Sequence, residues 1–283
     1  MKDNTPSKLL FQPNKGLGQN FLFDKNYLQK IADCCLIGTN TVIIEIGSGY
    51  GSLTNLLAET NCQKIISLEK DKNLFQWLEK DNKKDKIIYL NQDALTFDWK
   101  KFCLEHQNNS IVVVGNLPYY ITNSLVINLL FHFHLFKYFV FLVQKEVGQK
   151  WVASPEKYSS QYSSLSVFIN YLAETNLVFE IPRNVFKPIP KVDGALIIIK
   201  PRSEITREFS NEQFFPFLRF LKNCFRFRRK TLWNNLLSFS GNLSEEWEKY
   251  FSEKNYSTKI RPQNLTAKVY YSLFLYWKIM DKR

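Results

Sequence analysis

The sequence lacks the features that mark metalloproteins and disulfide-rich secreted proteins. Only 3 histidines occur in 283 residues. Two of them, His132 and His134, lie in an apolar stretch with no converging set of ligands, so we expect no bound metal. The 5 cysteines form no C-x-x-C pair. An odd number of such cysteines in a chain of this length favours reduced thiols over disulfides or zinc ligands.

Long apolar runs are also missing. The most hydrophobic window, residues 125–143, is interrupted by Asn128 and Lys137 as well as by the two histidines. It therefore predicts a helix followed by a strand and not a membrane span. The N-terminal segment MKDNTPSKLLFQPNKG contains no apolar core of the length that a signal peptide needs. We expect a soluble, cytoplasmic protein with no membrane partner.

Negative charge is in short supply. The chain has 26 acidic and 38 basic residues, a net charge of +12, and its apolar fraction of 45% predicts a globular protein with a sizeable core. Residues 201–283 contain 16 basic and 8 acidic residues, so they carry +8 of that charge. Proteins this basic usually bind a polyanion, either nucleic acid or an anionic membrane surface.

Short β-branched runs alternate with helical spacing through most of the chain, which predicts an α/β fold with a mostly parallel sheet and helices on both faces. Two later runs predict a closing hairpin at the sheet edge. After Pro201 only helical spacing remains, so we predict a first domain over residues 1–202 and a small all-α domain over 203–283. The candidate strands are residues 41–46, 64–69, 86–90, 111–115 and 138–143, with 176–181 and 195–200 forming the hairpin.

The first candidate strand ends in the glycine-rich stretch EIGSGYGSLT. Gly47, Gly49 and Gly51 let the backbone turn sharply and let a ligand approach without meeting a Cβ atom. The dinucleotide fingerprint G-x-G-x-x-G requires its third glycine at the position of Ser52. G-x-G-x-G preceded by an acidic residue, here Glu45, is instead typical of the S-adenosylmethionine (SAM) loop of class I methyltransferases. A glycine-rich turn without a ligand is the alternative.

Acidic residues follow the next two candidate strands. Glu69 ends the second strand about 20 residues beyond the glycines, where a carboxylate can accept both hydroxyls of a ribose. Asp93 follows the third strand, where it can accept hydrogens from the exocyclic amine of adenine. The ribose contact by itself does not separate NAD from SAM. Carboxyl ends of successive strands are where α/β folds bind ligands, so these residues predict one site.

The fourth candidate strand delivers NLPYY to the same edge. The lone pair of an exocyclic base amine is delocalised into the ring, and the Asn116 side-chain oxygen and the Leu117 carbonyl can accept its hydrogens and localise that pair. Pro118 fixes φ and stiffens the loop, and Tyr119 offers a face on which a base can stack. Tyr120 serves equally well as a packing residue. The stretch predicts amine methylation by positioning and electrostatics.

Asn-Leu-Pro-Tyr after GSGYGSLT resembles the motif of N6-adenine methyltransferases. Three further segments narrow the resemblance to the ribosomal RNA adenine dimethyltransferases, the KsgA family. They are KGLGQNFLFD (15–24), FKPIPKVDGALI (186–197) and FRFRRKTLWNNL (225–236). The resemblance spans residues 15–236, with the motifs in the expected order, and implies a Rossmann-like class I SAM-dependent methyltransferase sheet with a small all-α C-terminal domain.

The resemblance also implies roles for individual residues. Residues matching Gln19, Asn20 and Leu22 cover the SAM in that family, and the one matching Phe186 lies against the target base. The C-terminal domain is expected to contact rRNA, with a solvated helix face as the alternative for its basic run. The expected RNA contacts are Arg226, Arg228, Arg229 and Lys230. The expected cofactor contacts are Gln19, Asn20, Leu22, Glu45, Gly47, Gly49, Gly51, Glu69, Asp93 and Asn116, and the expected catalytic residues are Asn116, Leu117, Pro118, Tyr119 and Phe186.

Three functions compete within this resemblance. The first is a monomeric, metal-free enzyme that uses SAM to dimethylate two adjacent adenosines near the 3′ end of 16S rRNA in the small ribosomal subunit. RRKTLWNNL favours it, because that signature belongs to this branch of the family. The alternatives are a large-subunit rRNA adenine methylase of the macrolide-resistance type and an assembly factor that chiefly binds immature small subunits. Departures from the family pattern at Tyr120, Ser163 and Gly194 leave the shape of the base pocket open.

Overall fold

The structure is a computed structural model that describes residues 12–118, 120–205, 209–240 and 243–281. The chain divides into two compact units. The first comprises Met1–Gly148 and Asn176–Pro201, and the second comprises Gln149–Thr175 and Arg202–Arg283. This division differs from the predicted one, because residues 149–175 belong to the unit that also contains the C-terminal helices.

A seven-stranded sheet with the order β4-β3-β2-β5-β6-β9-β7 forms the first unit's framework. Its first five strands are parallel, and β9 is antiparallel to β6. The predicted α/β class and all seven predicted strands are confirmed. The order reverses between β3 and β5 on either side of β2, and ligands bind at such a switch point. The strands are β2 (Thr41–Ile46), β3 (Lys64–Leu68), β4 (Ile87–Leu90), β5 (Ser110–Asn116), β6 (Tyr138–Gln144), β7 (Ala173–Ile181) and β9 (Gly194–Pro201).

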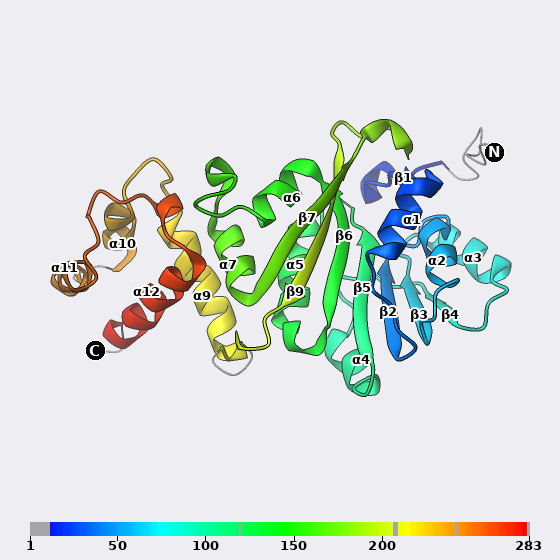
Figure 1. The fold of residues 1–283 in the computed structure, drawn as a ribbon, viewed down its shortest axis with the longest axis horizontal. Helices are drawn as coiled ribbons and strands as arrows, with labels where there is room; N and C mark the ends of the chain where they lie inside the picture. The colour runs from blue at the N-terminus through cyan, green and yellow to red at the C-terminus, as the bar shows by residue number, and fades with distance from the viewer. Residues whose placement is uncertain (1–11, 119, 206–208, 241–242, 282–283) are drawn as a thin grey trace. The chain divides into compact units, whose positions relative to one another are not determined.

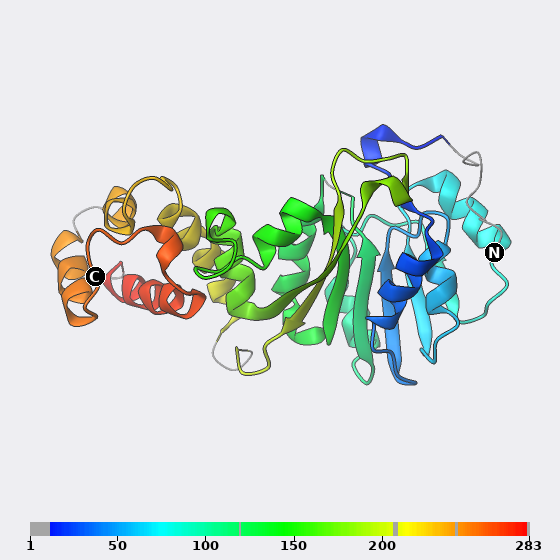
Figure 2. The same cartoon turned by 45° about the horizontal axis from the view of Figure 1, so that its top comes forward.

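Helices cover both faces of this sheet (Figure 1; Figure 2). All six residues of β2 are buried, which explains why its sequence is apolar without alternation. On one face, Leu28, Ile31 and Leu57 of the helices pack with Ile43 and Val112 of the strands. The helices are α1 (Lys25–Asp33), α2 (Ser52–Leu57), α3 (Lys72–Asp81), α4 (Trp99–Glu105), α5 (Thr122–Phe131) and α6 (Lys145–Trp151).

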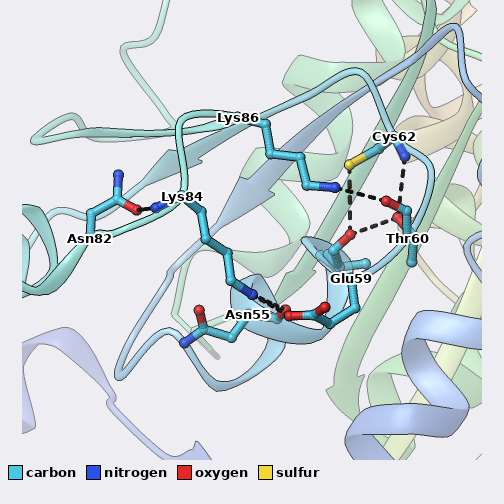
Figure 3. Close-up of polar contacts among 8 residues, drawn as sticks. Asn55, Glu59, Thr60, Cys62, Asn82, Lys84 and Lys86 are labelled. Carbon is cyan, nitrogen blue, oxygen red and sulfur yellow. Dashed lines mark hydrogen bonds and ion pairs between the residues drawn. The ribbon is translucent and has the colours of Figure 1, made fainter.

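Two lysines before β4 secure the end of α2 (Figure 3). Lys84 Nζ pairs with the Glu59 carboxylate and lies 3.3 Å from the Asn55 carbonyl. Lys86 Nζ donates to the Thr60 carbonyl at 2.8 Å. Cations are favourable near a helix C-terminus, where carbonyls lack intrahelical partners. These contacts fix α2, whose first turn follows the glycine-rich loop directly.

A separate two-stranded sheet joins the N-terminal segment to residues 186–187. In it, β1 (Phe21–Leu22) pairs antiparallel with β8 (Phe186–Lys187), and Leu22 lies opposite Phe186. The side chains of both residues are buried in the same core cluster. The pairing therefore ties the stretch that contains Gln19 and Asn20 to the body of the first unit.

The second unit is helical with an aromatic core. Phe168 and Tyr171 of α7 pack against Phe217, with ring centroids 5.9 and 5.4 Å apart. Tyr171 also stacks on Tyr271 at 4.3 Å. These contacts explain why residues 149–175 belong to this unit. None of the helices within the described ranges is long and apolar enough to cross a membrane. The α-helices are α7 (Ser164–Leu172), α9 (Asn211–Cys224), α10 (Leu232–Ser240), α11 (Ser244–Glu253) and α12 (Ala267–Met280).

Candidate active site

An open cavity lies at the carboxyl ends of β2, β3, β4 and β5 and is closed on one side by the N-terminal segment. It gathers residues from five separate stretches of the sequence, as the positions of the strand ends predict. The predicted site residues that line it are Gln19, Asn20, Gly47, Gly49, Glu69, Asp93, Asn116, Leu117 and Pro118.

The glycine-rich loop needs its glycines for backbone reasons. Gly47, Gly49 and Gly51 have φ values of 78°, 55° and 71°, in the left-handed region. A Cβ atom on Gly49 would lie 2.9 Å from the Phe21 ring. Gly47 and Gly49 line the cavity, whereas Gly51 precedes α2 as its N-cap and lies outside the cavity lining. Gly51 thus starts the helix, and its contact with the cofactor stays a prediction.

Glu69 is a buried carboxylate fixed by main-chain amides. Its Oε2 accepts from the Gly49 N–H at 2.9 Å, and its Oε1 accepts from the Asp71 N–H at 2.8 Å. Burial raises the pKa of this carboxyl, and the two amide hydrogen bonds oppose that rise. The side chain thus joins the glycine-rich loop to the start of α3 and presents a preoriented acceptor to the cavity.

Glu45 is buried, and its contact with the cofactor stays a prediction. Its side chain is 1% exposed and lies outside the lining of this cavity, although it reaches a smaller adjacent one. Thr54 Oγ1 and Ser67 Oγ donate to its Oε2 at 2.5 and 2.6 Å. Burial raises the pKa of Glu45 to about 7, against the effect of these two hydrogen bonds. The contacts make Glu45 a support that links β2, α2 and β3.

Asp93 carries an ion pair that the sequence analysis did not predict. Its Oδ2 lies 2.8 Å from Lys70 Nζ, and its Oδ1 accepts from the Leu95 N–H at 2.9 Å. Partial burial opposes these contacts, but the hydrogen bonds and the charge of Lys70 lower the pKa of Asp93. Lys70 lines the cavity. The sequence feature that could have predicted this role of Lys70 is its position directly after Glu69, just beyond the end of β3.

The Asn116 amide is held from the other side of the cavity. Its Nδ2 donates to the Asn20 carbonyl at 2.8 Å. Within the described part of the chain, no donor reaches Asn116 Oδ1 or the Leu117 carbonyl, whereas the Pro118 carbonyl accepts from Ile121 N and Thr122 Oγ1. Two acceptors are thus left at the end of β5, as the chemistry of a base amine requires.

Two tyrosines follow Pro118 in the sequence. Tyr119, the predicted stacking residue, lies outside the described residues. Tyr120 lines the cavity, and its side chain is 52% exposed. The sequence allowed a packing role for Tyr120 as readily as a ligand contact. In the structure Tyr120 is exposed at the cavity, where a ligand could contact it.

The remaining N-terminal and motif residues occupy two environments. Gln19 Nε2 donates to Asp71 Oδ2 at 3.0 Å, which joins the N-terminal segment to the first residues after β3. Leu22 and Phe186 are buried opposite one another and lie outside the lining of the main cavity. In this structure Phe186 is a core residue, because it is buried in the same apolar cluster as Leu22. Its contact with a target base stays a prediction.

The basic run RFRRK is not helical, contrary to the helix assumed for it. Here α9 ends at Cys224, and residues 225–230 form successive turns before α10. Arg226, Arg228, Arg229 and Lys230 are all exposed. Arg228 Nη2 donates to the Ser160 carbonyl at 2.5 Å and to the Tyr162 carbonyl at 3.2 Å. Arg228 therefore supports the unit, and the other three cations are left for a ligand.

Groups of three or more metal-ligating side chains are absent from the described residues. The polar groups that line the cavity are carboxylates, amides and the Lys70 ammonium that pairs with Asp93, together with main-chain groups. The acceptors among these groups match a ligand with hydroxyl and amino hydrogens, which is the donor pattern of an adenosine-containing cofactor. The buried acceptor at Glu69 and the glycines that leave room beside it fit SAM.

Comparison with known proteins gives the chain its relatives. The family model for ribosomal RNA adenine dimethylase matches residues 10–278. A ribosomal RNA small subunit methyltransferase A from Streptococcus thermophilus is 39% identical over 257 residues, covering 89% of this chain and 86% of that protein. One from Mycoplasmopsis pulmonis is 35% identical over 262 residues, covering 92% of this chain and 97% of that protein.

Two solved structures share the fold. A dimethyladenosine transferase from Plasmodium falciparum has a TM-score of 0.73 at 22% identity, covering 92% of this chain and 96% of that one. The 23S rRNA methyltransferase ErmE has a TM-score of 0.68 at 22% identity, covering 91% and 99%. At such identity the likeness concerns the fold alone. The family model and the sequence relatives extend over most of the chain, and the chain belongs to the ribosomal RNA adenine dimethylase family.

Proposed function

We propose that this protein transfers methyl groups from SAM to the N6 amines of two adjacent adenosines near the 3′ end of 16S rRNA in the small ribosomal subunit. The observation that carries the proposal is the Asn116 amide. Its nitrogen is engaged by the Asn20 carbonyl, so its oxygen is the atom left for an amine hydrogen. The relatives named as small subunit methyltransferases favour this substrate over the large subunit.

The residues of this chain divide the work of cofactor binding. SAM supplies an electrophilic methyl group. In the proposal, Glu69 accepts the ribose hydroxyls, Asp93 accepts from the adenine amine, and Gly47 and Gly49 leave space for the backbone to approach the ligand. Gln19 and Asn20 bound the cavity from the N-terminal side. The fixed positions of the Glu69 and Asp93 carboxylates reduce the reorganisation required on binding.

The substrate end of the cavity acts on the target amine. Asn116 Oδ1 and the Leu117 carbonyl accept its two hydrogens, which withdraws the lone pair from the ring and aims it at the methyl group. Pro118 restricts the backbone that carries the Leu117 carbonyl. No group needs to remove a proton before transfer, because the amine becomes acidic once it is alkylated. Positioning and electrostatic stabilisation then supply the rate enhancement.

The exposed cations of residues 225–230 are the proposed rRNA contacts. A cavity that takes one adenine cannot select among the many adenines of a ribosome, so selection requires contacts elsewhere. The +8 charge of residues 201–283 suits a phosphate backbone. We place the enzyme in the cytoplasm, where its ribosomal substrate is assembled. We propose that it acts as a monomer.

Labelled SAM tests the proposal directly. The protein would be incubated with under-methylated small subunits, large subunits and naked rRNA, and the modified nucleotides would be mapped. We expect two adjacent dimethylated adenosines near the 3′ end of 16S rRNA. Label confined to one adenosine of large-subunit rRNA would replace the proposal with the resistance-type activity. Tight small-subunit binding without label would favour an assembly factor.

A further inference from the structure

An exposed aromatic ring stands among the cations of the basic turn. The Phe227 side chain is 39% exposed. The Arg226 guanidinium carbon lies 5.2 Å from its ring centroid, and Lys230 Nζ lies 4.7 Å from it. A single exposed apolar side chain is common, so what distinguishes this ring is the pair of cations that lie over it.

The turn that carries Phe227 is held from inside. The Asn235 side chain is fully buried, and its Oδ1 accepts from the Phe227 N–H at 2.9 Å while its Nδ2 donates to the Phe227 carbonyl at 3.2 Å. Both main-chain hydrogen-bonding groups of Phe227 are therefore used by one side chain. The ring is presented to solvent by a fixed backbone.

A second ring of the same kind lies on the adjoining turn. The Tyr158 side chain is 37% exposed, and Lys157 Nζ lies 5.4 Å from its ring centroid. Tyr158 has a φ of 53°, a costly conformation for a tyrosine, and such conformations cluster at functional sites. The hydrogen bonds from Arg228 to the Ser160 and Tyr162 carbonyls join the two turns.

We infer that these two turns form a stacking surface for unpaired RNA nucleotides. The stacking surface consists of Phe227 and Tyr158 with the cations Arg226, Lys230 and Lys157. A base stacks on each ring, and the cations contact the flanking phosphates. The inference rests on the proposed function, because it assumes that the second unit binds rRNA, and it adds the form of RNA that the surface recognises.

The chemistry favours unpaired RNA over other polyanions. A cation over an exposed ring is held weakly, and a stacked base interacts more strongly with that ring. A base can therefore displace the cation toward a phosphate, where it stays paired. In a continuous RNA duplex the bases are already stacked on one another, so single strands, loops and bulges are the forms that can use such rings.

The test measures binding of the full-length protein to under-methylated small subunits over a series of salt concentrations. Phe227→Ala and Phe227→Leu remove the stacking ring, and Leu keeps an apolar side chain in case Ala perturbs folding. We expect roughly 5- to 100-fold weaker binding for both, by a similar factor at every salt concentration. Phe227→Trp is expected to bind as the wild type does, and Tyr158→Leu to weaken binding in the same way as Phe227→Leu.

Two controls separate stacking from charge and from folding. Phe215 is 58% exposed on the same helix that precedes the turn, nine residues before Cys224, and Phe215→Ala is expected to bind normally. Arg226→Ala is expected to reduce the salt slope by about one. Unchanged affinity in both Phe227→Leu and Tyr158→Leu would overturn the stacking surface. If Arg226→Ala still flattened the slope, the proposed function would stand without it.

Discussion

The cavity of the first unit and the basic turn of the second unit use polar groups in opposite ways. In the cavity, Glu69 and Asn116 are hydrogen-bonded to the main chain of another segment, and Asp93 accepts from the main chain two residues further on. Among the described cations of the basic turn, Arg228 is the one whose side chain donates to main-chain carbonyls, whereas Arg226 and Lys230 lie over an exposed ring.

The difference reflects two kinds of task. Chemistry on a weakly nucleophilic amine requires acceptors that are already in position, because reorganisation during the reaction raises the barrier. Docking on a phosphate backbone requires charge that can adapt and is screened by salt. Substitutions in the cavity should therefore change rates and cofactor affinity strongly, whereas those in the turn should act on RNA binding or local stability.

The largest expected effect is that of Asn116→Ala. The variant loses an acceptor that the amine needs as it becomes a nucleophile, so methyl transfer should slow by about 10²–10³-fold. SAM affinity should change little. Single-turnover methylation and calorimetry measure the two quantities. The control is Asn40→Ala, because Asn40 lies just before β2, outside the cavity, and its side-chain amide donates to the Asn108 carbonyl before β5. Turnover within a few-fold of wild type would remove Asn116 from the mechanism.

Glu45→Gln should alter how stability depends on pH. Burial raises the pKa of Glu45 from 4.5 to about 7, so the folded protein binds this proton more tightly than the unfolded chain does. Wild-type stability should therefore fall as pH rises from about 4.5 to 7, and the fall should exceed that of the variant by up to about 3 kcal/mol. Urea denaturation at several pH values measures this. Parallel curves for the two proteins would contradict the support role of an ionisable Glu45.

Glu69→Ala should weaken SAM binding by roughly 1–3 kcal/mol, the cost of losing charge-assisted hydrogen bonds to the ribose. Calorimetry measures it, and NAD serves as the competing ligand that should not bind. The matched control is Glu59→Ala, because Glu59 is an exposed carboxylate paired with Lys84 away from the cavity (Figure 3). Tighter binding of NAD than of SAM would refute the cofactor assignment.

The smallest effects are expected for two cations of the basic turn. Arg228→Ala should cost about 1 kcal/mol of unfolding free energy, because the Ser160 and Tyr162 carbonyls lose their donor. Arg226→Ala should change stability by less than about 0.5 kcal/mol. Chemical denaturation compares them. If Arg226→Ala lowers the free energy of unfolding as much as Arg228→Ala does, the two arginines do not differ in their structural role.

The sequence by itself determined the sheet and the edge of it at which the cavity lies. Buried β-branched runs specify strands wherever they occur, and parallel strands bring their carboxyl ends to one edge. Glu69, Asp93 and Asn116 each stand at or just after such an end, so their convergence followed from local patterns. The left-handed glycines were equally visible, because no other residue takes those conformations readily.

Only the tertiary structure decided which of these residues border the cavity. Glu45 and Glu69 are both acidic residues on neighbouring strands, yet Glu45 is enclosed by Thr54 and Ser67 while Glu69 borders the cavity. Their roles depend on contacts with residues 9 to 22 positions away, which no short pattern encodes.

The same reason governs the other differences between prediction and structure. Residues 149–175 belong to the helical unit because the rings of α7 match those of α9 and α12 across the chain. Arg228 lies in the same short basic run as Arg226 and Arg229, so the run itself does not distinguish them. What distinguishes Arg228 is that its side chain donates to the Ser160 and Tyr162 carbonyls. Asn116 is oriented by Asn20, 96 residues earlier. Local patterns specify elements and their ends, whereas the partners of a side chain depend on which distant segments folding brings beside it.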